Sequence, residues 1–129
     1  MAAINEVTDL AIDGDIAVVT VDSAPVNALS STVRAGIDTA VKQANESEAT
    51  AIVLICAGRT FIAGADITEF GGATKGPSLR DVQDTLENSA IPVVAAIHGT
   101  ALGGGLELAL CAHYRIAVPS AKCGLPEVN

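Results

Sequence analysis

The sequence predicts an α/β fold with a mainly parallel sheet, and two features of its 129 residues support that prediction. After an opening hairpin, segments with helical and strand-like patterns alternate, as they do when helices connect the strands of a parallel sheet. In addition, the strand-length segments at 51–57 and 92–97 are apolar throughout. Such runs are typical of strands that are covered on both faces.

Local patterns give the elements in chain order. They predict a hairpin at 7–23, a loop at 23–30, a helix at 30–47, a strand at 51–57, a glycine-rich segment at 59–77, a helix at 78–90, a strand at 92–97, a helix at 106–113 and a strand at 114–120. Residues 13–15, Asp-Gly-Asp, supply the hairpin turn. Ser30 or Ser31 is the expected N-cap of the first long helix, and Ser78 caps the next one, with Asp81 in its first turn.

Composition narrows the class of protein. The net charge of −8 argues against a nucleic-acid-binding protein, which normally shows a basic patch. No apolar run is long enough to span a bilayer, and the first residues lack the pattern of a signal peptide. The three cysteines form no CxxC pair, which favours reduced thiols and a cytoplasmic location. No cluster of His, Cys and acidic residues has metal-ligand spacing, so we expect no metal site.

The hydrophobic composition of the chain indicates what its core and surface consist of. Half of its residues are hydrophobic, only 2% are aromatic, and the mean hydropathy is +0.46. The core must therefore consist of small aliphatic side chains. Because the mean hydropathy is high for a free-standing small domain, we expect some apolar surface to face a partner chain or further sequence.

Two glycine-rich loops, "AGAD" at 63–66 and "LGGG" at 102–105, follow the predicted strands. Ligands of α/β folds usually bind where loops leave the carboxyl ends of the strands. Glycines before a helix let a ligand approach backbone N–H groups that have no partner inside the helix. These N–H groups can bind a phosphate or an oxyanion formed during a reaction. Alternatively, the glycines only permit close packing of a helix on a strand.

Two carboxylates are candidates for acid–base chemistry. Glu107 follows the second loop in a segment that is apolar around much of its circumference, which predicts a buried carboxylate. The alternative is an acidic residue favoured by a helix N-terminus. Glu127 lies after Pro126 and, taken alone, indicates an exposed charge at a strand end. Lesser candidates are Asp66, Glu69, His98 and His113.

Three stretches in order, "FIAGADITEF", "IPVVAAIHGTALGGGLELAL" and "YRIAVPSAKCGLPEV", resemble the enoyl-CoA hydratase/isomerase (crotonase) superfamily. The likeness is greatest to the hydratase region at the N-terminus of multifunctional fatty-acid oxidation enzymes. The resemblance implies a ββα spiral with a mainly parallel sheet, of which this chain is the N-terminal portion. Residues 1–129 would then form a partial domain whose C-terminal part is missing, and the full-length parent would form homo-oligomers, trimer-like in the family.

The resemblance also implies a site. Backbone N–H groups of Ala65 and Gly104 match the family's two-amide oxyanion hole, and Glu107 and Glu127 match its two catalytic glutamates. Many relatives carry a Lys two residues after the Asp of the first motif, where this chain has Thr68. Residues matching the loops that line the substrate and CoA groove are Asn27, Ala28, Leu29, Ala63, Gly64, Ala65, Asp66, Ile67, Gly103 and Gly104.

The implied reaction is the syn addition of water to a 2-trans-enoyl-CoA thioester, giving a 3-hydroxyacyl-CoA in fatty-acid β-oxidation. CoA is part of the substrate, so no cofactor is expected. The partners would be an acyl-CoA and further copies of the full-length chain, with no nucleic acid and no membrane span. Three alternatives remain: an isomerase that moves the double bond between C3 and C2, a non-catalytic acyl-CoA binding fragment, and a self-associating scaffold.

Overall fold

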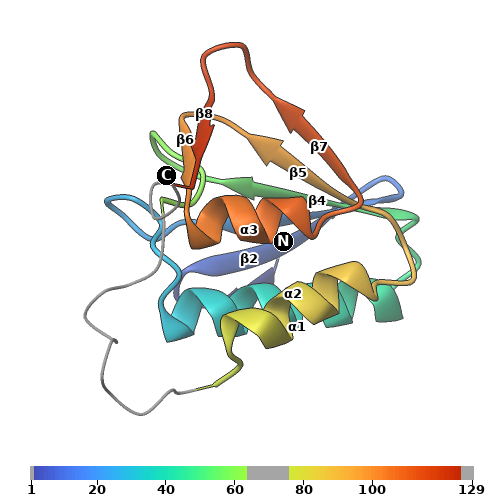
Figure 1. The fold of residues 1–129 in the computed structure, drawn as a ribbon. Helices are drawn as coiled ribbons and strands as arrows, with labels where there is room; N and C mark the ends of the chain where they lie inside the picture. The colour runs from blue at the N-terminus through green and yellow to red at the C-terminus, as the bar shows by residue number, and fades with distance from the viewer. Residues whose placement is uncertain (1, 64–75, 126–129) are drawn as a thin grey trace.

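The computed structural model describes residues 2–63 and 76–125 (Figure 1). Its helices and strands alternate as the sequence predicts. In chain order they are β1 (Ala2–Asn5), β2 (Thr8–Asp13), β3 (Ile16–Val21), α1 (Ser31–Glu46), β4 (Ala51–Cys56), α2 (Leu79–Glu87), β5 (Val93–Ile97), β6 (Thr100–Leu102), α3 (Gly104–Leu110), β7 (Tyr114–Ala117) and β8 (Lys122–Gly124). The strands β1, β6 and β8 were not predicted from the sequence.

The main sheet has the strand order β1-β2-β3-β4-β5-β7. The pairs β1–β2 and β2–β3 are antiparallel, whereas β3–β4, β4–β5 and β5–β7 are parallel. Asp13 pairs with Ile16, which leaves a two-residue turn, and Gly14 takes the positive φ of 62° that this turn requires. A second sheet consists of the parallel pair β6–β8. The predicted hairpin and mainly parallel sheet are therefore confirmed.

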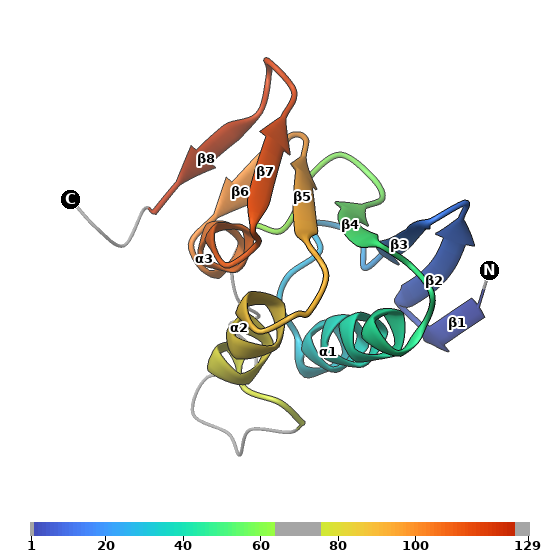
Figure 2. The same ribbon diagram turned by 90° about the vertical axis from the view of Figure 1, so that its right-hand side faces the viewer.

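The helices α1, α2 and α3 cover one face of the main sheet (Figure 2). Burial alternates along each parallel strand, so that Ile52 and Leu54 of β4 are fully buried whereas Val53 is only half-buried. Val18 and Val94 pair with Val53 from the neighbouring strands, and they are half-buried as well. The prediction that the apolar strands are covered on both faces is thus wrong for the described residues, because the helices there pack on one face only.

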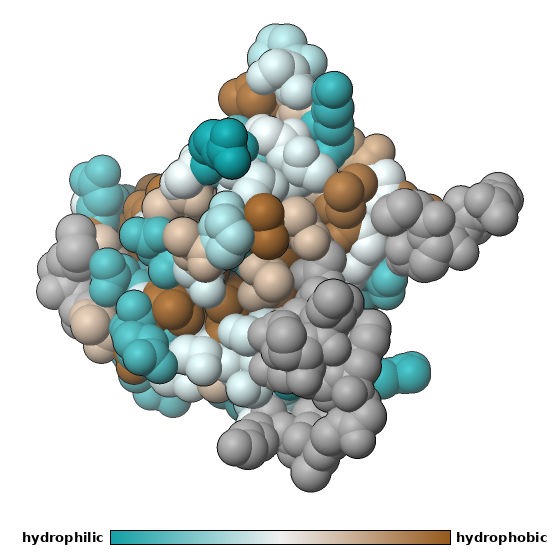
Figure 3. Space-filling model, turned by 90° about the vertical axis from the view of Figure 1, so that its left-hand side faces the viewer, coloured by the Kyte–Doolittle hydropathy of each residue, from teal (hydrophilic) through white to brown (hydrophobic). Residues whose placement is uncertain are grey.

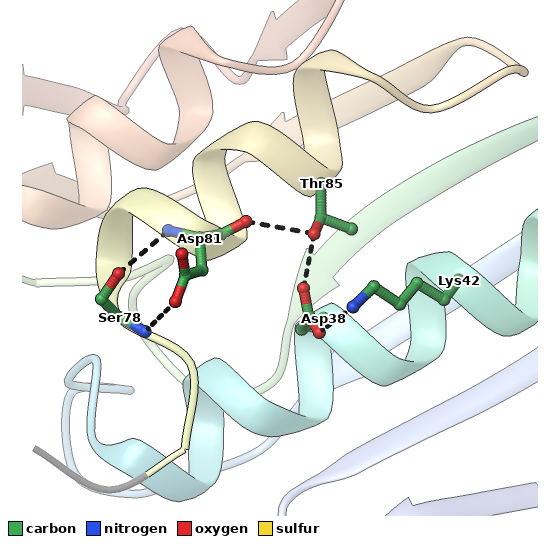
Figure 4. A network of polar contacts seen from close by, with 5 residues as sticks. All are labelled: Asp38, Lys42, Ser78, Asp81 and Thr85. Carbon is green, nitrogen blue, oxygen red and sulfur yellow. Dashed lines mark hydrogen bonds and ion pairs between the residues drawn. The ribbon is translucent and has the colours of Figure 1, made fainter.

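Helices α1 and α2 are fixed by the caps that the sequence signals. Ser30, and not Ser31, is the N-cap of α1, and its hydroxyl accepts a hydrogen bond from Val33 N–H at 3.2 Å. Ser78 and Asp81 form a capping box at α2, with bonds of 3.0 and 3.1 Å (Figure 4). Hydrogen bonding of the Ser78 backbone N–H, and then of its side chain, to the Asp81 carboxyl lowers the pKa of that carboxyl. The sequence therefore predicts both helix starts to within one residue.

A polar bridge joins the facing sides of α1 and α2 (Figure 4). The Thr85 hydroxyl donates to the Asp38 carboxylate, and the Lys42 ammonium lies 2.9 Å from the same carboxylate. The hydrogen bond and charge of Asp38 raise the pKa of Lys42. The bond from Thr85 to Asp38 thus connects α2 to α1 through polar side chains.

Candidate functional site

The second glycine-rich loop forms a sharp turn into α3. Gly103 has φ 53° and ψ −123°, a conformation that favours glycine, and its N–H donates to Gly124 O at 2.9 Å. The first helical bond runs from Glu107 N–H to Gly103 O at 2.9 Å. The N–H groups of residues 104–106 precede that bond, so no carbonyl of α3 accepts them. These N–H groups therefore have no acceptor within the helix, and the prediction that they bind a ligand stays a prediction.

Helix α3 is shorter at its end than the sequence predicts. It was expected over 106–113 but spans Gly104–Leu110. His113 N–H donates to Val93 O at 2.9 Å, and Val93 N–H donates to the His113 ring Nδ1, also at 2.9 Å. These two bonds direct the chain into the sheet, because they place it beside β5, where β7 begins. His113 is therefore held by backbone groups of a strand rather than placed in a site.

The second predicted loop begins beside Ala63, the one residue of the first predicted loop that the structure describes. Leu102 N–H donates to Ile62 O at 3.1 Å, and Ala63 forms a parallel bridge with Leu102. A Cβ added at Gly105 would lie 1.9 Å from Ile62 O, so only glycine permits this approach of α3. The structure therefore brings Ala63, at the start of the first loop, next to the glycines of the second.

Gly104 has different surroundings from Gly105. Among the described residues, a Cβ on Gly104 would meet the side-chain ends of Leu29 at 3.2 Å and Leu79 at 3.4 Å. The packing explanation therefore fits Gly105, whereas backbone conformation explains Gly103. Gly104 is constrained less strictly than either, and the oxyanion-hole role of its N–H stays a prediction.

Glu107 is exposed, so the prediction of a buried carboxylate is wrong. Helix α3 buries Gly105, Leu108 and Ala109, and it leaves Leu110 52% exposed. The apolar surface of the segment therefore extends beyond what the described part of the chain covers. Glu107 lies one helical turn after Gly103, on a surface that water can reach.

The Cys111 thiol is surrounded by carboxylates. Its pKa is raised to about 11, first by burial, then by a hydrogen bond and charge from Glu87, with smaller effects of Asp84 and Glu107. Burial alone raises the pKa of Cys56 to about 12. Both cysteines are therefore protonated at neutral pH and unsuited to act as nucleophiles.

The buried side chain of Asn27 connects the loop before α1 to the loop after β4. Asn27 is 2% exposed, and its side-chain amide donates to Ala57 O and Thr60 O while its carbonyl accepts from Ser23 N–H. Leu29 is also buried, at 1% exposure, and Ala28 is half-buried. Any contact of Asn27 with CoA would use its backbone, because its side-chain polar atoms are engaged.

Several predicted site residues lie outside the described residues, so their roles stay predictions. They are Gly64, Ala65, Asp66, Ile67, Glu69 and Glu127. Of the remaining lesser candidates, His98 has its ring Nε2 2.8 Å from Gly58 O, so it contacts the backbone of the loop after β4. Among residues 2–63 and 76–125, no group of three His, Cys, Asp or Glu side chains could hold a metal ion.

The loops after β3, β4 and β5 lie at the same end of the sheet, on the left of Figure 1. Seen from that side, hydrophobic and hydrophilic surface alternates over the described residues (Figure 3). A groove of about 510 Å³ between α1 and α2, lined in part by Asn45 and Asn88, lies elsewhere, toward the C-terminal ends of those helices. No helix in the described part of the chain is long and apolar enough to cross a membrane.

Known proteins resemble this chain in sequence and in overall structure. A model of the enoyl-CoA hydratase/isomerase family matches residues 11–129. The peroxisomal bifunctional enzyme of Danio rerio is 49% identical over 115 residues, which are 88% of this chain and 16% of that protein. A probable enoyl-CoA hydratase of Bacillus subtilis (strain 168) is 41% identical over 128 residues, 93% of this chain and 50% of that protein. A crystal structure of an enoyl-CoA hydratase/carnithine racemase from Magnetospirillum magneticum has a TM-score of 0.85 and 33% identity, and the match covers 95% of this chain and 50% of that one.

The chain belongs to the enoyl-CoA hydratase/isomerase family, since the family match covers most of its length. The predicted family fold and the likeness to multifunctional enzymes are therefore confirmed. The chain spans half or less of the length of these three relatives.

Proposed function

We propose that this chain carries the oxyanion hole and the water-activating glutamate of an enoyl-CoA hydratase. The observation that carries the proposal is the contact between the second glycine-rich loop and residues 62–63, where the first loop begins. Leu102 N–H donates to Ile62 O, and α3 packs close to the same carbonyl because Gly105 has no side chain. This contact supports a site in which amides from both loops face one substrate atom.

The proposed substrate is a 2-trans-enoyl-CoA thioester. When water attacks C3, the electron pair of the double bond moves toward the carbonyl, and negative charge develops on the thioester oxygen as an enolate. The N–H groups of Gly104 and Ala65 donate to that oxygen. Preorganised donors of this kind lower the barrier by about 3 kcal/mol each.

Two glutamates complete the proposed reaction. Glu107, as a carboxylate, takes a proton from the water that attacks C3, and its exposure on α3 lets water reach it. Glu127, protonated, delivers a proton to C2, and the product is a 3-hydroxyacyl-CoA. The two groups share one water, so the division of roles belongs to the pair rather than to either residue. No cofactor takes part, because CoA is a portion of the substrate.

The proposal extends to the surroundings of the site. Residues 27–29, 63–67 and 103–104 line the groove for substrate and CoA, largely through backbone atoms. Residues 1–129 form part of a larger domain of the family, and the full-length protein forms homo-oligomers. We place the protein in the cytoplasm on the basis of its cysteines, although the Danio rerio relative is named peroxisomal.

The test is an assay of this chain with crotonyl-CoA, the absorbance of the conjugated thioester being followed alongside a calorimetric titration. Loss of absorbance with formation of 3-hydroxybutyryl-CoA supports the proposal. Binding without turnover favours the non-catalytic acyl-CoA fragment, and neither binding nor turnover favours the scaffold. Conversion of a 3-enoyl-CoA to its 2-enoyl isomer, with no hydration, would identify the isomerase. Each of the last three results overturns the hydratase assignment.

A further inference from the structure

The side chain of Asn27 is built into the junction of two loops. The residue is 2% exposed and has a φ of 52°, in the left-handed region that Asn tolerates better than most residues. Its own N–H donates to Ser23 O at 2.8 Å, and its side-chain carbonyl accepts from Ser23 N–H at 2.7 Å. These bonds close the turn before α1 and direct the carboxamide inward.

The amide end of the same side chain reaches across to the loop after β4. Nδ2 donates to Ala57 O at 2.9 Å and to Thr60 O at 2.9 Å. Both acceptors are backbone groups some 30 residues away in sequence, and each lies within the turn that leads to Ala63. The side-chain carbonyl and amide of Asn27 therefore both form hydrogen bonds with protein backbone groups.

Further bonds connect this junction to the glycine-rich loop before α3. The Thr60 hydroxyl donates to Thr100 O at 2.7 Å, and Phe61 N–H donates to His98 O at 3.0 Å. Ala63 N–H donates back to Val26 O at 3.2 Å, beside Asn27. Hydrogen bonds thus connect the three loops that follow β3, β4 and β5. The buried side chain of Asn27 bonds to the first two of these loops.

We infer that Asn27 is a positioning residue, whose carboxamide sets the position of residues 57–63 relative to the amides of the loop that begins at Gly103. This inference rests on the proposed function, because this position matters when amides of both loops bind one oxygen. It differs from the role in CoA contact predicted from the sequence, since here Asn27 acts through backbone groups and not on the ligand.

The experiment compares two Asn→Asp variants. Asn27→Asp keeps the size of the side chain and the tolerance of a positive φ, but it replaces the donating amide by a carboxylate oxygen that faces two carbonyls. Asn45→Asp is the matched control, because Asn45 also bridges a helix and a loop, through Val41 O, Ser89 Oγ and Ala90 N–H. Asn45 lies near the opposite end of α1 from Asn27. A third variant, Asn27→Gly, removes the carboxamide and leaves the backbone free to keep φ 52°.

Two readouts separate positioning from stability. The first is kcat and KM for crotonyl-CoA hydration by this chain. The second is amide hydrogen exchange, with residues 57–63 compared with β5 and β7. We expect Asn27→Asp and Asn27→Gly to lower kcat by about 10²-fold, the cost of misplacing a reacting group by roughly 1 Å, with KM changed less than about threefold. Exchange should rise at residues 57–63 but not in β5 and β7, and Asn45→Asp should leave kcat unchanged.

The inference is overturned if the Asn27 variants keep wild-type kcat, or if Asn45→Asp lowers kcat as much. It is also overturned if exchange rises equally throughout the sheet, because Asn27 would then support only global stability. Should the wild-type chain show no hydration, the proposed function fails. The exchange data still decide in that case, since unchanged protection of residues 57–63 in Asn27→Asp refutes the positioning role by itself.

Discussion

Replacing Gly105 by alanine tests whether α3 must contact the loop after β4. Gly105 is buried in α3, and its backbone is helical, so alanine is compatible with its conformation. The new Cβ, however, would lie 1.9 Å from Ile62 O and 2.6 Å from Ile62 C. Since such contacts below 3.0 Å essentially never occur, the helix and the 60–63 segment must move apart by about 1.1 Å.

The energetic cost follows from the type of atom that is met. Overpacking costs about 1–3 kcal/mol, and the upper end applies because Ile62 O is backbone and no rotamer change relieves the contact. Alanine regains about 1 kcal/mol of helix propensity over glycine. We therefore expect Gly105→Ala to lower the free energy of unfolding by about 2 kcal/mol. With a urea m-value of about 2 kcal/mol/M, the midpoint of unfolding falls by about 1 M.

The assay is urea unfolding followed by circular dichroism, with Gly104→Ala as the control. Among the described residues, a Cβ at Gly104 meets the ends of the Leu29 and Leu79 side chains, at 3.2 and 3.4 Å, and no backbone atom. We expect its free energy of unfolding to change by less than about 0.5 kcal/mol. If the two variants unfold at the same urea concentration, the proposed contact between α3 and Ile62 is not what requires glycine.

The remaining predictions concern thiol reactivity and helix capping. At pH 7 a thiol-alkylating reagent should modify Cys123 first, because Cys123 is exposed. The pKa of Cys111 is raised to about 11 and that of Cys56 to about 12, so these two thiols should react more slowly. Labelling is measured by mass spectrometry, and equal labelling of Cys111 and Cys123 would contradict this order. Ser78→Ala should lower the free energy of unfolding by about 1 kcal/mol, because it removes the N-cap of α2, and a loss below about 0.3 kcal/mol would argue against the capping box. The pKa of Asp81 is below its ordinary value of 3.8 in the folded state, so its stabilising effect is complete above that pH and is lost as the pH falls through the folded pKa. Asp81→Asn should therefore destabilise the chain at pH 7 and cease to differ from wild type in strong acid, and a difference that is independent of pH would contradict this assignment.

Signals that lie close together in sequence predicted the local structure well. The Gly14 turn requires only two residues between the strands, and the capping box at Ser78 and Asp81 spans three positions. Helical spacing gave α1 to within a residue at each end. These features depend on backbone groups a few residues away, so a sequence contains nearly all of the information that fixes them.

Features set by distant contacts were predicted less well. The apolar pattern around Glu107 does not say how much of α3 its neighbours cover, and Leu110 and Glu107 are in fact exposed. Helix α3 ends early because His113 pairs with Val93, 20 residues away in sequence. The buried bonds of Asn27 join segments about 30 residues apart, and the loop position of Asn27 gives no sign of them. A buried polar residue with a positive φ is visible only once the chain is folded.

The central claim is that Glu107 activates water beside the Gly104 amide. The most direct measurement is the rate of crotonyl-CoA hydration by Glu107→Gln, with Glu46→Gln as the control. Glu46 is an exposed glutamate at the end of α1, so both variants remove one negative charge from an exposed position on a helix. We expect kcat to fall by at least about 10²-fold for Glu107→Gln and to stay unchanged for Glu46→Gln. Equal kcat values for Glu107→Gln and the wild-type chain would contradict it.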